Sequence, residues 1–142
     1  MGTRSAIAYY TDRGTVRGKY SHYDGYPEYT GAVLEEHYTD VARVRNMVDL
    51  GDQSYILPEF IPTGKHTFEE PEENVTIFYG RDRGESGVEA REFDTIQEFV
   101  DYYADMMCEY FYIFTDKGWL VSSKYYYEEF APVADKISKE VS

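Results

Sequence analysis

Alternation of apolar and polar residues near the N-terminus predicts a β-hairpin. Residues 5–11 and residues 16–23 each alternate in the way that half-buried strands do. Residues 12–14 (DRG) between them are a turn sequence, and residues 24–27 (DGYP) end the second strand. We therefore expect two antiparallel strands joined by a tight turn.

Helical periodicity follows the hairpin. A first short helix places Val33, Leu34 and His37 on one side. A second helix, capped by Thr39 or Asp40 and ended by Gly51, carries the apolar residues Val41, Val44, Met47 and Val48.

The middle of the chain has the composition of a loop. Residues 52–74 contain three of the five prolines and four glutamates close together. After it, residues 75–79 read as a strand and residues 80–87 as a polar turn, with residues 88–93 pairing back. The loop has the composition of a hinge, but it is too short to indicate two domains.

The second half resumes regular structure with a helix over residues 95–107. Thr95 and Glu98 form a capping box in which the glutamate reaches back to the cap amide. The apolar face of this helix consists of Ile96, Phe99, Val100, Tyr103 and Met107. Residues 109–115 and 119–123 read as a second hairpin. A last helix, starting near Pro132, carries Phe130, Val133, Ala134, Ile137 and Val141.

This element order, ββαα-β(β)-αββα, predicts a single α+β domain spanning residues 1–142. The short hairpin links favour a mainly antiparallel sheet with about four helices. A chain of 142 residues with 42% hydrophobic residues is long enough to bury a core.

Charge narrows the functional classes. The net charge is −13, and it is uneven: residues 1–68 hold 9 acids and 7 Lys/Arg, whereas residues 69–142 hold 18 acids and 7 Lys/Arg. Direct nucleic-acid binding needs a basic face, so it is not expected. No apolar run reaches the roughly 20 residues of a membrane span, so we expect a cytoplasmic protein without membrane association.

Residues suited to catalysis or metal binding are few. Ser5 lies in TRSAI, which lacks the glycines of a nucleophile elbow, and no cation near Cys108 would stabilise a thiolate. Cys108 therefore reads as a small buried residue. The only relation between His22 and Asp24 is that alternation places both on one side of a strand, and this is weak evidence for a metal site. We predict no catalytic residue, metal or cofactor, and a non-enzyme is favoured over an enzyme acting on a phosphorylated small molecule.

Several short motifs occur together in a characteristic order. They are residues 1–5 (MGTRS), 22–27 (HYDGYP), 50–52 (LGD), 79–85 (YGRDRGE), and the segment from 109–112 (EYFY) to Gly118-Trp119. In this order they resemble an uncharacterised family of small bacteriophage proteins opening with MGTRS, over residues 1 to about 123. The resemblance implies a phage context, and hence the cytoplasm of an infected host cell, but no mechanism.

The resemblance also groups three segments into a possible ligand pocket. The glycines of residues 80–87 expose amides, and Arg81 and Arg83 are suited to clamp an anion. The structural alternative is a tight turn whose arginines pair with neighbouring carboxylates. The pocket residues would be Arg4, Ser5, His22, Asp24, Tyr26, Arg81, Arg83 and Glu85.

One charge pattern stands out on the 95–107 helix. Acidic residues spaced by 4, 3, 4 and 4 form a stripe opposite the apolar face. No Lys or Arg occurs between Arg91 and Lys117, so the repulsion has no offset within the helix. The carboxylates rise roughly 4.5–6 Å apart, near the spacing of DNA phosphates. The stripe consists of Asp94, Glu98, Asp101, Asp105 and Glu109.

Two functions compete on these observations. The first is a non-enzymatic phage effector that binds a basic host protein, a nucleic-acid-handling or defence component, through an acidic and DNA-mimicking face. The second is a module that binds or sequesters a nucleotide or another anion in the pocket described above. An ordinary solvated helix face is the structural alternative to the first. The sequence does not decide whether the chain forms a homodimer.

Overall fold

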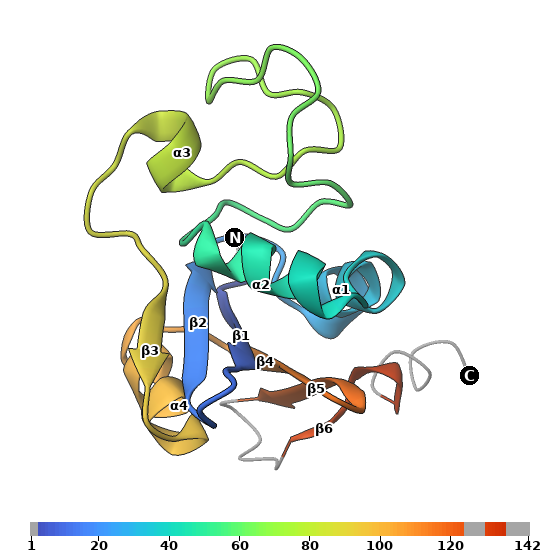
Figure 1. Cartoon of the computed structure of the whole chain (residues 1–142), viewed down its shortest axis with the longest axis vertical. Helices are drawn as coiled ribbons and strands as arrows, with labels where there is room; N and C mark the ends of the chain where they lie inside the picture. The colour runs from blue at the N-terminus through green and yellow to red at the C-terminus, as the bar shows by residue number, and fades with distance from the viewer. Residues whose placement is uncertain (1–2, 124–129, 136–142) are drawn as a thin grey trace.

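A six-stranded sheet forms the centre of the protein (Figure 1). The computed structural model describes residues 3–123 and 130–135. The strand order is β3-β2-β1-β4-β5-β6, and four of the five pairings are antiparallel, whereas β1 and β4 are parallel. The mainly antiparallel sheet predicted from the sequence is therefore confirmed. The strands are β1 (Ser5–Tyr10), β2 (Val16–Ser21), β3 (Arg91–Phe93), β4 (Tyr110–Thr115), β5 (Gly118–Ser123) and β6 (Ala131–Pro132).

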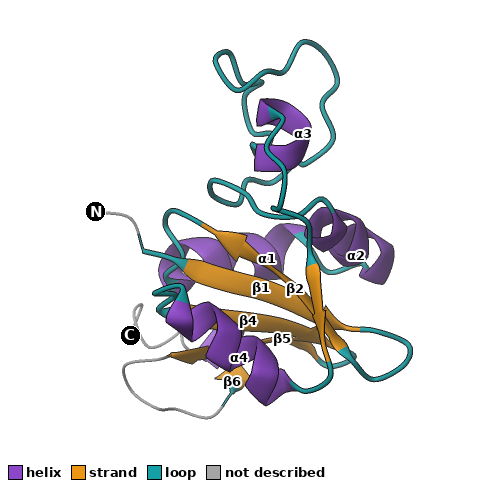
Figure 2. Cartoon of the chain, turned by 90° about the vertical axis from the view of Figure 1, so that its left-hand side faces the viewer, coloured by secondary structure: helices purple, strands orange, loops and turns teal. Residues whose placement is uncertain are grey.

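Helices cover both faces of the sheet (Figure 2). A π-helical turn, η1 (Pro27–Gly31), runs directly into α1 (Ala32–His37), and α2 (Val41–Asp49) packs beside it on one face. The other face is covered by α4 (Ile96–Asp105). With α3 (Tyr79–Arg83), the described residues contain five helices, against about four predicted. The chain is a single α+β domain, as the sequence predicted.

The central strand β1 is buried on both faces because helices cover both faces of the sheet, and β2 and β4 cover its two edges. Ile7 and Tyr9 point into the cluster under α1 and α2. Ala6 and Ala8 point to α4, and their small size lets the rings of α4 approach the sheet closely. The two sides of this one strand therefore divide the core into two layers.

The helix α4 packs as its periodicity predicts. Phe99 and Tyr103 are buried, and Ile96 and Val100 are partly buried against the same cluster. Met107 was wrongly placed on this face: it follows the helix in a left-handed conformation (φ 69°) and is 60% exposed. The chain reverses there, and Cys108, which is fully buried as predicted, occupies the interior instead.

The capping box differs from the prediction by one residue. The Thr95 hydroxyl accepts a hydrogen bond from the Glu98 amide (3.2 Å), as expected. The Glu98 carboxylate, however, accepts from the amide of Asp94 (3.0 Å) and not from that of Thr95. Glu98 therefore stabilises the start of α4 through its side chain.

The region between residues 75 and 93 corrects the sequence prediction. Residues 75–79 form isolated bridges, Gln53 with Phe78 and Glu59 with Val75, in place of a strand. The predicted polar turn begins with the helix α3, because the Asp82 carboxylate accepts a hydrogen bond from the Phe78 amide (2.8 Å) at its start. β3 pairs with β2, not with residues 75–79.

The C-terminal helix is described only in part. Phe130 precedes β6 and is not in a helix, which corrects the prediction, because Ala131 and Pro132 pair with β5. Residues 133–135 have helical backbone. Ile137 and Val141 lie outside the described residues.

A buried lysine joins the sheet to the long segment after α2. Lys19 of β2 is fully buried, and its ammonium donates to the carbonyl of Met47 (2.8 Å) and to Oε1 of Gln53. It also lies 4.5 Å from the centroid of the Phe78 ring. Burial lowers the pKa of Lys19 well below its usual value. This role was not predicted from the sequence, because lysine is rarely buried.

Asp52 lies at the same junction and accepts a hydrogen bond from the Tyr20 amide (3.0 Å). Burial raises the pKa of Asp52 to about 6, although the Tyr20 amide and Lys19 oppose the shift. Between pH 4 and 6 the folded state therefore holds a proton that the unfolded state has released, and stability falls as pH rises through this range.

We expect Asp52→Asn to remove this pH dependence while keeping an acceptor for the Tyr20 amide. Between pH 4 and 6.5 the free energy of unfolding of the native protein should fall by about 1–2 kcal/mol more than that of the variant. Urea denaturation at several pH values measures both. Other carboxylates titrate alike in the two proteins, so parallel curves would contradict the assignment.

Candidate functional site

Three carboxylates line the exposed side of α4, and a fourth belongs to Asp94, the residue that precedes the capping Thr95. All four side chains are exposed, opposite the buried Phe99 and Tyr103. Within residues 3–123 and 130–135, none of them takes part in an ion pair. We call this surface the acidic face; it consists of Asp94, Glu98, Asp101 and Asp105.

Glu109 does not belong to the acidic face, which corrects the sequence prediction. The helix ends at Asp105, and the turn through Met107 takes the chain off the helical path before Glu109. The Glu109 amide donates to the carbonyl of Arg4 (2.8 Å), beside the start of β1. The spacing of four residues therefore no longer corresponds to one turn of helix at this position.

The acidic face contains no internal compensation for its charge. Asp101 accepts a hydrogen bond from Nε2 of Gln97 (2.9 Å), which is neutral. Arg91 lies over the ring of Tyr102 (5.0 Å) instead of forming a salt bridge with a carboxylate. Like charges at i,i+4 destabilise a helix by about 0.2–0.5 kcal/mol per pair, so the arrangement costs stability.

Exposed apolar side chains adjoin the acidic face. Tyr102 of α4 is 36% exposed and lies one turn from both Glu98 and Asp105. Met107, just beyond the helix, is 60% exposed. Tyrosine and methionine are enriched where proteins contact one another, whereas an ordinary solvated face is polar throughout.

The N-terminal segment and the DGYP segment lie together, as the predicted pocket requires. The Gly25 amide donates to the carbonyl of Thr3 (2.8 Å), and the Tyr112 hydroxyl donates to the carbonyl of Gly25 (2.6 Å). Asp24 adopts a left-handed conformation (φ 55°) at this corner. These bonds make the corner a structural joint between β1, β4 and the start of η1.

The other predicted pocket residues near this joint are already engaged or buried. Arg4 donates to the carbonyl of Met106 (3.3 Å), and Ser5 is fully buried. Nδ1 of His22 is hydrogen-bonded to the Tyr20 hydroxyl (2.6 Å). Burial, together with Arg4, lowers the pKa of His22, so its ring is neutral at pH 7. Tyr26 is 37% exposed beside Tyr29.

The arginines of α3 are bound within their own part of the chain, which rises above the sheet in Figures 1 and 2. Arg81 pairs with Asp82 (2.9 Å) and donates to the carbonyls of Phe60 (2.5 Å) and Thr76 (3.3 Å). Arg83 lies over the Phe68 ring (4.8 Å), and Glu85 is exposed. The Arg81–Asp82 pair agrees with the structural alternative, in which the arginines pair with neighbouring carboxylates.

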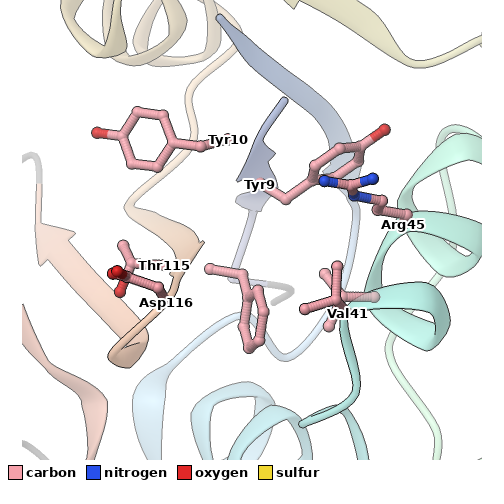
Figure 3. Close-up of a pocket in the computed structure, with 8 residues that line it drawn as sticks. Tyr9, Tyr10, Val41, Arg45, Thr115 and Asp116 are labelled. Atoms are coloured by element: carbon pink, nitrogen blue, oxygen red, sulfur yellow. The ribbon is translucent and has the colours of Figure 1, made fainter. Parts of the chain in front are cut away.

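A groove of about 450 Å³ lies where β1 and β4 end beside α2 (Figure 3). Its lining is mainly apolar and contains one cation, Arg45, whose guanidinium lies beside the Tyr9 ring (5.7 Å). Asp116 lies on the opposite side of the groove. The lining residues are Tyr9, Tyr10, Val41, Val44, Arg45, Phe114, Thr115 and Asp116.

The groove was not predicted from the sequence. Its lining comes from three segments that are more than 25 residues apart in the chain. The parallel pairing of β1 with β4 brings two of these segments together. Alternation predicts each strand but not which strands become neighbours, so no local pattern indicated the groove.

Residues 3–123 and 130–135 contain neither a cluster of metal ligands nor a membrane-spanning helix. In that part of the chain no three His, Cys, Asp or Glu side chains are grouped as metal ligands. No helix there is both long and apolar enough to span a bilayer. Comparison with protein-family models, curated proteins and solved structures gives no match to this chain.

Proposed function

We propose that the chain is a non-enzymatic bacteriophage effector that binds a basic, nucleic-acid-handling or defence protein of the infected cell through the acidic face. One observation carries the proposal: three exposed carboxylates lie along one side of α4 and a fourth, that of Asp94, just precedes its cap, and none of the four forms an ion pair in the described structure. An arrangement that costs stability and lies on the surface is typical of a binding site.

The geometry of α4 supports mimicry of a nucleic-acid backbone. A helix rises 1.5 Å per residue, so carboxylates three or four residues apart advance about 4.5–6 Å along the axis. Duplex DNA carries one phosphate per 3.4 Å of axis along each strand, so the carboxylates are spaced more widely than phosphates and resemble them as a row of like charges, several of which a basic groove neutralises. The helix is rigidly held, because Phe99 and Tyr103 are buried in the sheet cluster.

The exposed Tyr102 and Met107 favour a protein partner over a small cation. A metal ion or polyamine is recognised by carboxylates alone, whereas protein interfaces combine aromatic and methionine side chains with a polar rim. Rim charges mainly accelerate association and select the partner, and the apolar contacts hold the complex. The acidic face and these two side chains together supply both parts.

A double charge reversal, Asp101→Lys with Asp105→Lys, tests the proposal. We expect unchanged or slightly higher stability, because a lysine at 101 follows Glu98 by one turn and a lysine at 105 suits the helix C-terminus. Asp94 and Glu98 are left intact, because the Glu98 carboxylate stabilises the helix start. Capture of basic proteins from a bacterial host lysate should be lost.

The control reverses two exposed acids of the long loop, Glu69→Lys with Glu73→Lys, which changes the net charge equally. This variant should retain capture. Capture by the native protein should fall steeply between about 50 and 200 mM salt, and a 20-base-pair DNA duplex should compete with it. If the Asp101/Asp105 variant captures the same proteins as the native chain, the acidic face is a solvated helix surface and the proposal fails.

A further inference from the structure

The groove of Figure 3 gathers exposed apolar surface at one end of the sheet. Tyr10 and Val41 on its walls are 41% and 49% exposed, which is high for large hydrophobic residues. Phe114 also lines the groove, and its ring packs edge-to-face on the chain's one tryptophan, Trp119 (5.1 Å). A volume of about 450 Å³ lies in the range of small-molecule sites.

The guanidinium of Arg45 has hydrogen-bonding capacity left over. Its Nη2 donates to Oδ1 of Asp12 (2.7 Å), an aspartate whose side chain is 84% exposed. Its Nε is buried and has no hydrogen-bond partner in the described structure. A buried donor without an acceptor is unfavourable, but the protein covers this Nε, so a ligand in the groove reaches the guanidinium through its Nη atoms, which match the two oxygens of a carboxylate.

Charge complementarity indicates the class of ligand. A chain with a net charge of −13 repels anions in general, so an anion binds only where a local cation holds it. Arg45, which is also paired with Asp12, supplies that cation beside the apolar walls. Arg13 lies in an adjoining hollow that shares Tyr9 and Arg45 with the groove, but it is paired with Glu92 (2.6 Å). We propose that the groove binds a small aromatic carboxylate, its ring between Phe114 and Val41 and its carboxylate on Arg45.

This inference is independent of the acidic face, which lies on α4 at the opposite side of the sheet. Asp12 and Asp116 also border the two hollows, and they would favour a cation. The sign of the bound charge therefore decides the question. Phenylacetate and phenethylamine carry the same ring with opposite head-group charges and serve as the two probes.

The experiment is an NMR titration of the full chain with each probe at pH 7. Phenylacetate should shift the amides of Tyr10, Val41 and Arg45 with a dissociation constant on the order of 1–10 mM, as expected for a ligand of this size. Phenethylamine should bind the groove at least about fivefold more weakly, since it cannot accept from the guanidinium. Equal or tighter binding of the amine at these residues would overturn the proposal.

Two variants test whether phenylacetate binds at Arg45 and Val41. Arg45→Gln should weaken phenylacetate binding at least about tenfold, because it removes a hydrogen bond to a charged group. Val41→Glu, at the first residue of α2, where the helix dipole favours an acid, adds a repelling charge to the wall and should weaken binding as well. Arg83→Gln makes the same charge change as Arg45→Gln on α3 and should bind as the native chain does. If both groove variants also bind phenylacetate as the native chain does, the groove is not the site.

Discussion

Replacing Phe99 with alanine should lower the free energy of unfolding by about 3–5 kcal/mol. The Phe99 ring is fully buried between α4 and the sheet. It packs edge-to-face with Phe93 (5.8 Å), Tyr103 (5.4 Å) and Phe111 (6.3 Å), so its removal leaves a cavity and breaks three aromatic contacts. Urea denaturation followed by circular dichroism measures the loss.

The matched control is Gln97→Ala, an exposed position on the same helix. Its effect should stay within about 0.5 kcal/mol, as is usual at exposed sites. A loss of less than 1 kcal/mol for Phe99→Ala would show that α4 does not pack on the sheet through this ring.

Gly18 of β2 provides an independent test of the same contact. A Cβ added at Gly18 would lie 2.6 Å from Cε1 of Phe99, closer than real Cβ contacts. Gly18→Ala should therefore cost about 1–3 kcal/mol in the native chain. In the Phe99→Ala background the ring is absent and only the Cβ of Ala8 (3.2 Å) stays close, so the same change should cost much less. Additive effects of the two changes would contradict the contact.

Local patterns predicted the parts of this fold that depend on local interactions. The N-terminal hairpin follows from alternation and a short turn, and the buried face of α4 follows from its period of about 3.6 residues. The prediction for Met107 failed because the helix ends two residues earlier, where the left-handed turn changes the direction of the chain. Periodicity continues in the sequence beyond the point where the helix stops.

Long-range pairing accounts for most of what the sequence did not predict. Residues 75–79 have the composition of a strand, yet their partners are single residues of the preceding loop, Gln53 and Glu59. The first part of the predicted polar turn, residues 80–87, belongs to the helix α3. This helix forms because the Asp82 carboxylate accepts a hydrogen bond from the Phe78 amide and because Gly84 ends the helix in a left-handed conformation. Such short capped helices have too few residues for a periodic signal.

The candidate sites show the same difference between local patterns, which the sequence predicts, and long-range pairing, which it does not. The acidic face depends on one helix, so four of the five residues predicted from spacing belong to it, and the prediction failed for Glu109, where the helix had ended. The groove beside Arg45 depends on the parallel pairing of β1 with β4, which no local pattern indicates. In the predicted pocket Arg81 was expected to bind an anion, whereas in the structure it pairs with Asp82. Chemistry on a single element is therefore easier to predict than chemistry at a junction of elements.

Replacing Gly51 with alanine should destabilise the protein by about 3 kcal/mol. Gly51 follows α2 with φ +88°, a conformation that costs roughly 1–2 kcal/mol for a residue with a side chain. A Cβ there would also lie 2.4 Å from the carbonyl oxygen of Val88. That oxygen accepts a hydrogen bond from the Asp52 amide (2.8 Å), so it cannot retreat without breaking the bond, and overpacking adds about 1–3 kcal/mol.

Gly84→Ala separates the two causes. Gly84 has a similar left-handed conformation (φ +76°), but no atom lies within 4 Å of the position its Cβ would take. Its substitution should cost only the conformational part, about 1–2 kcal/mol. For a domain of this size the Gly51 variant should then melt roughly 6–12 °C below the native protein, and the Gly84 variant only about 2–8 °C below it. Equal melting temperatures for the two variants would mean that the Val88 carbonyl does not crowd Gly51, and that the segment after α2 is not fixed to the chain before β3 as the structure has it.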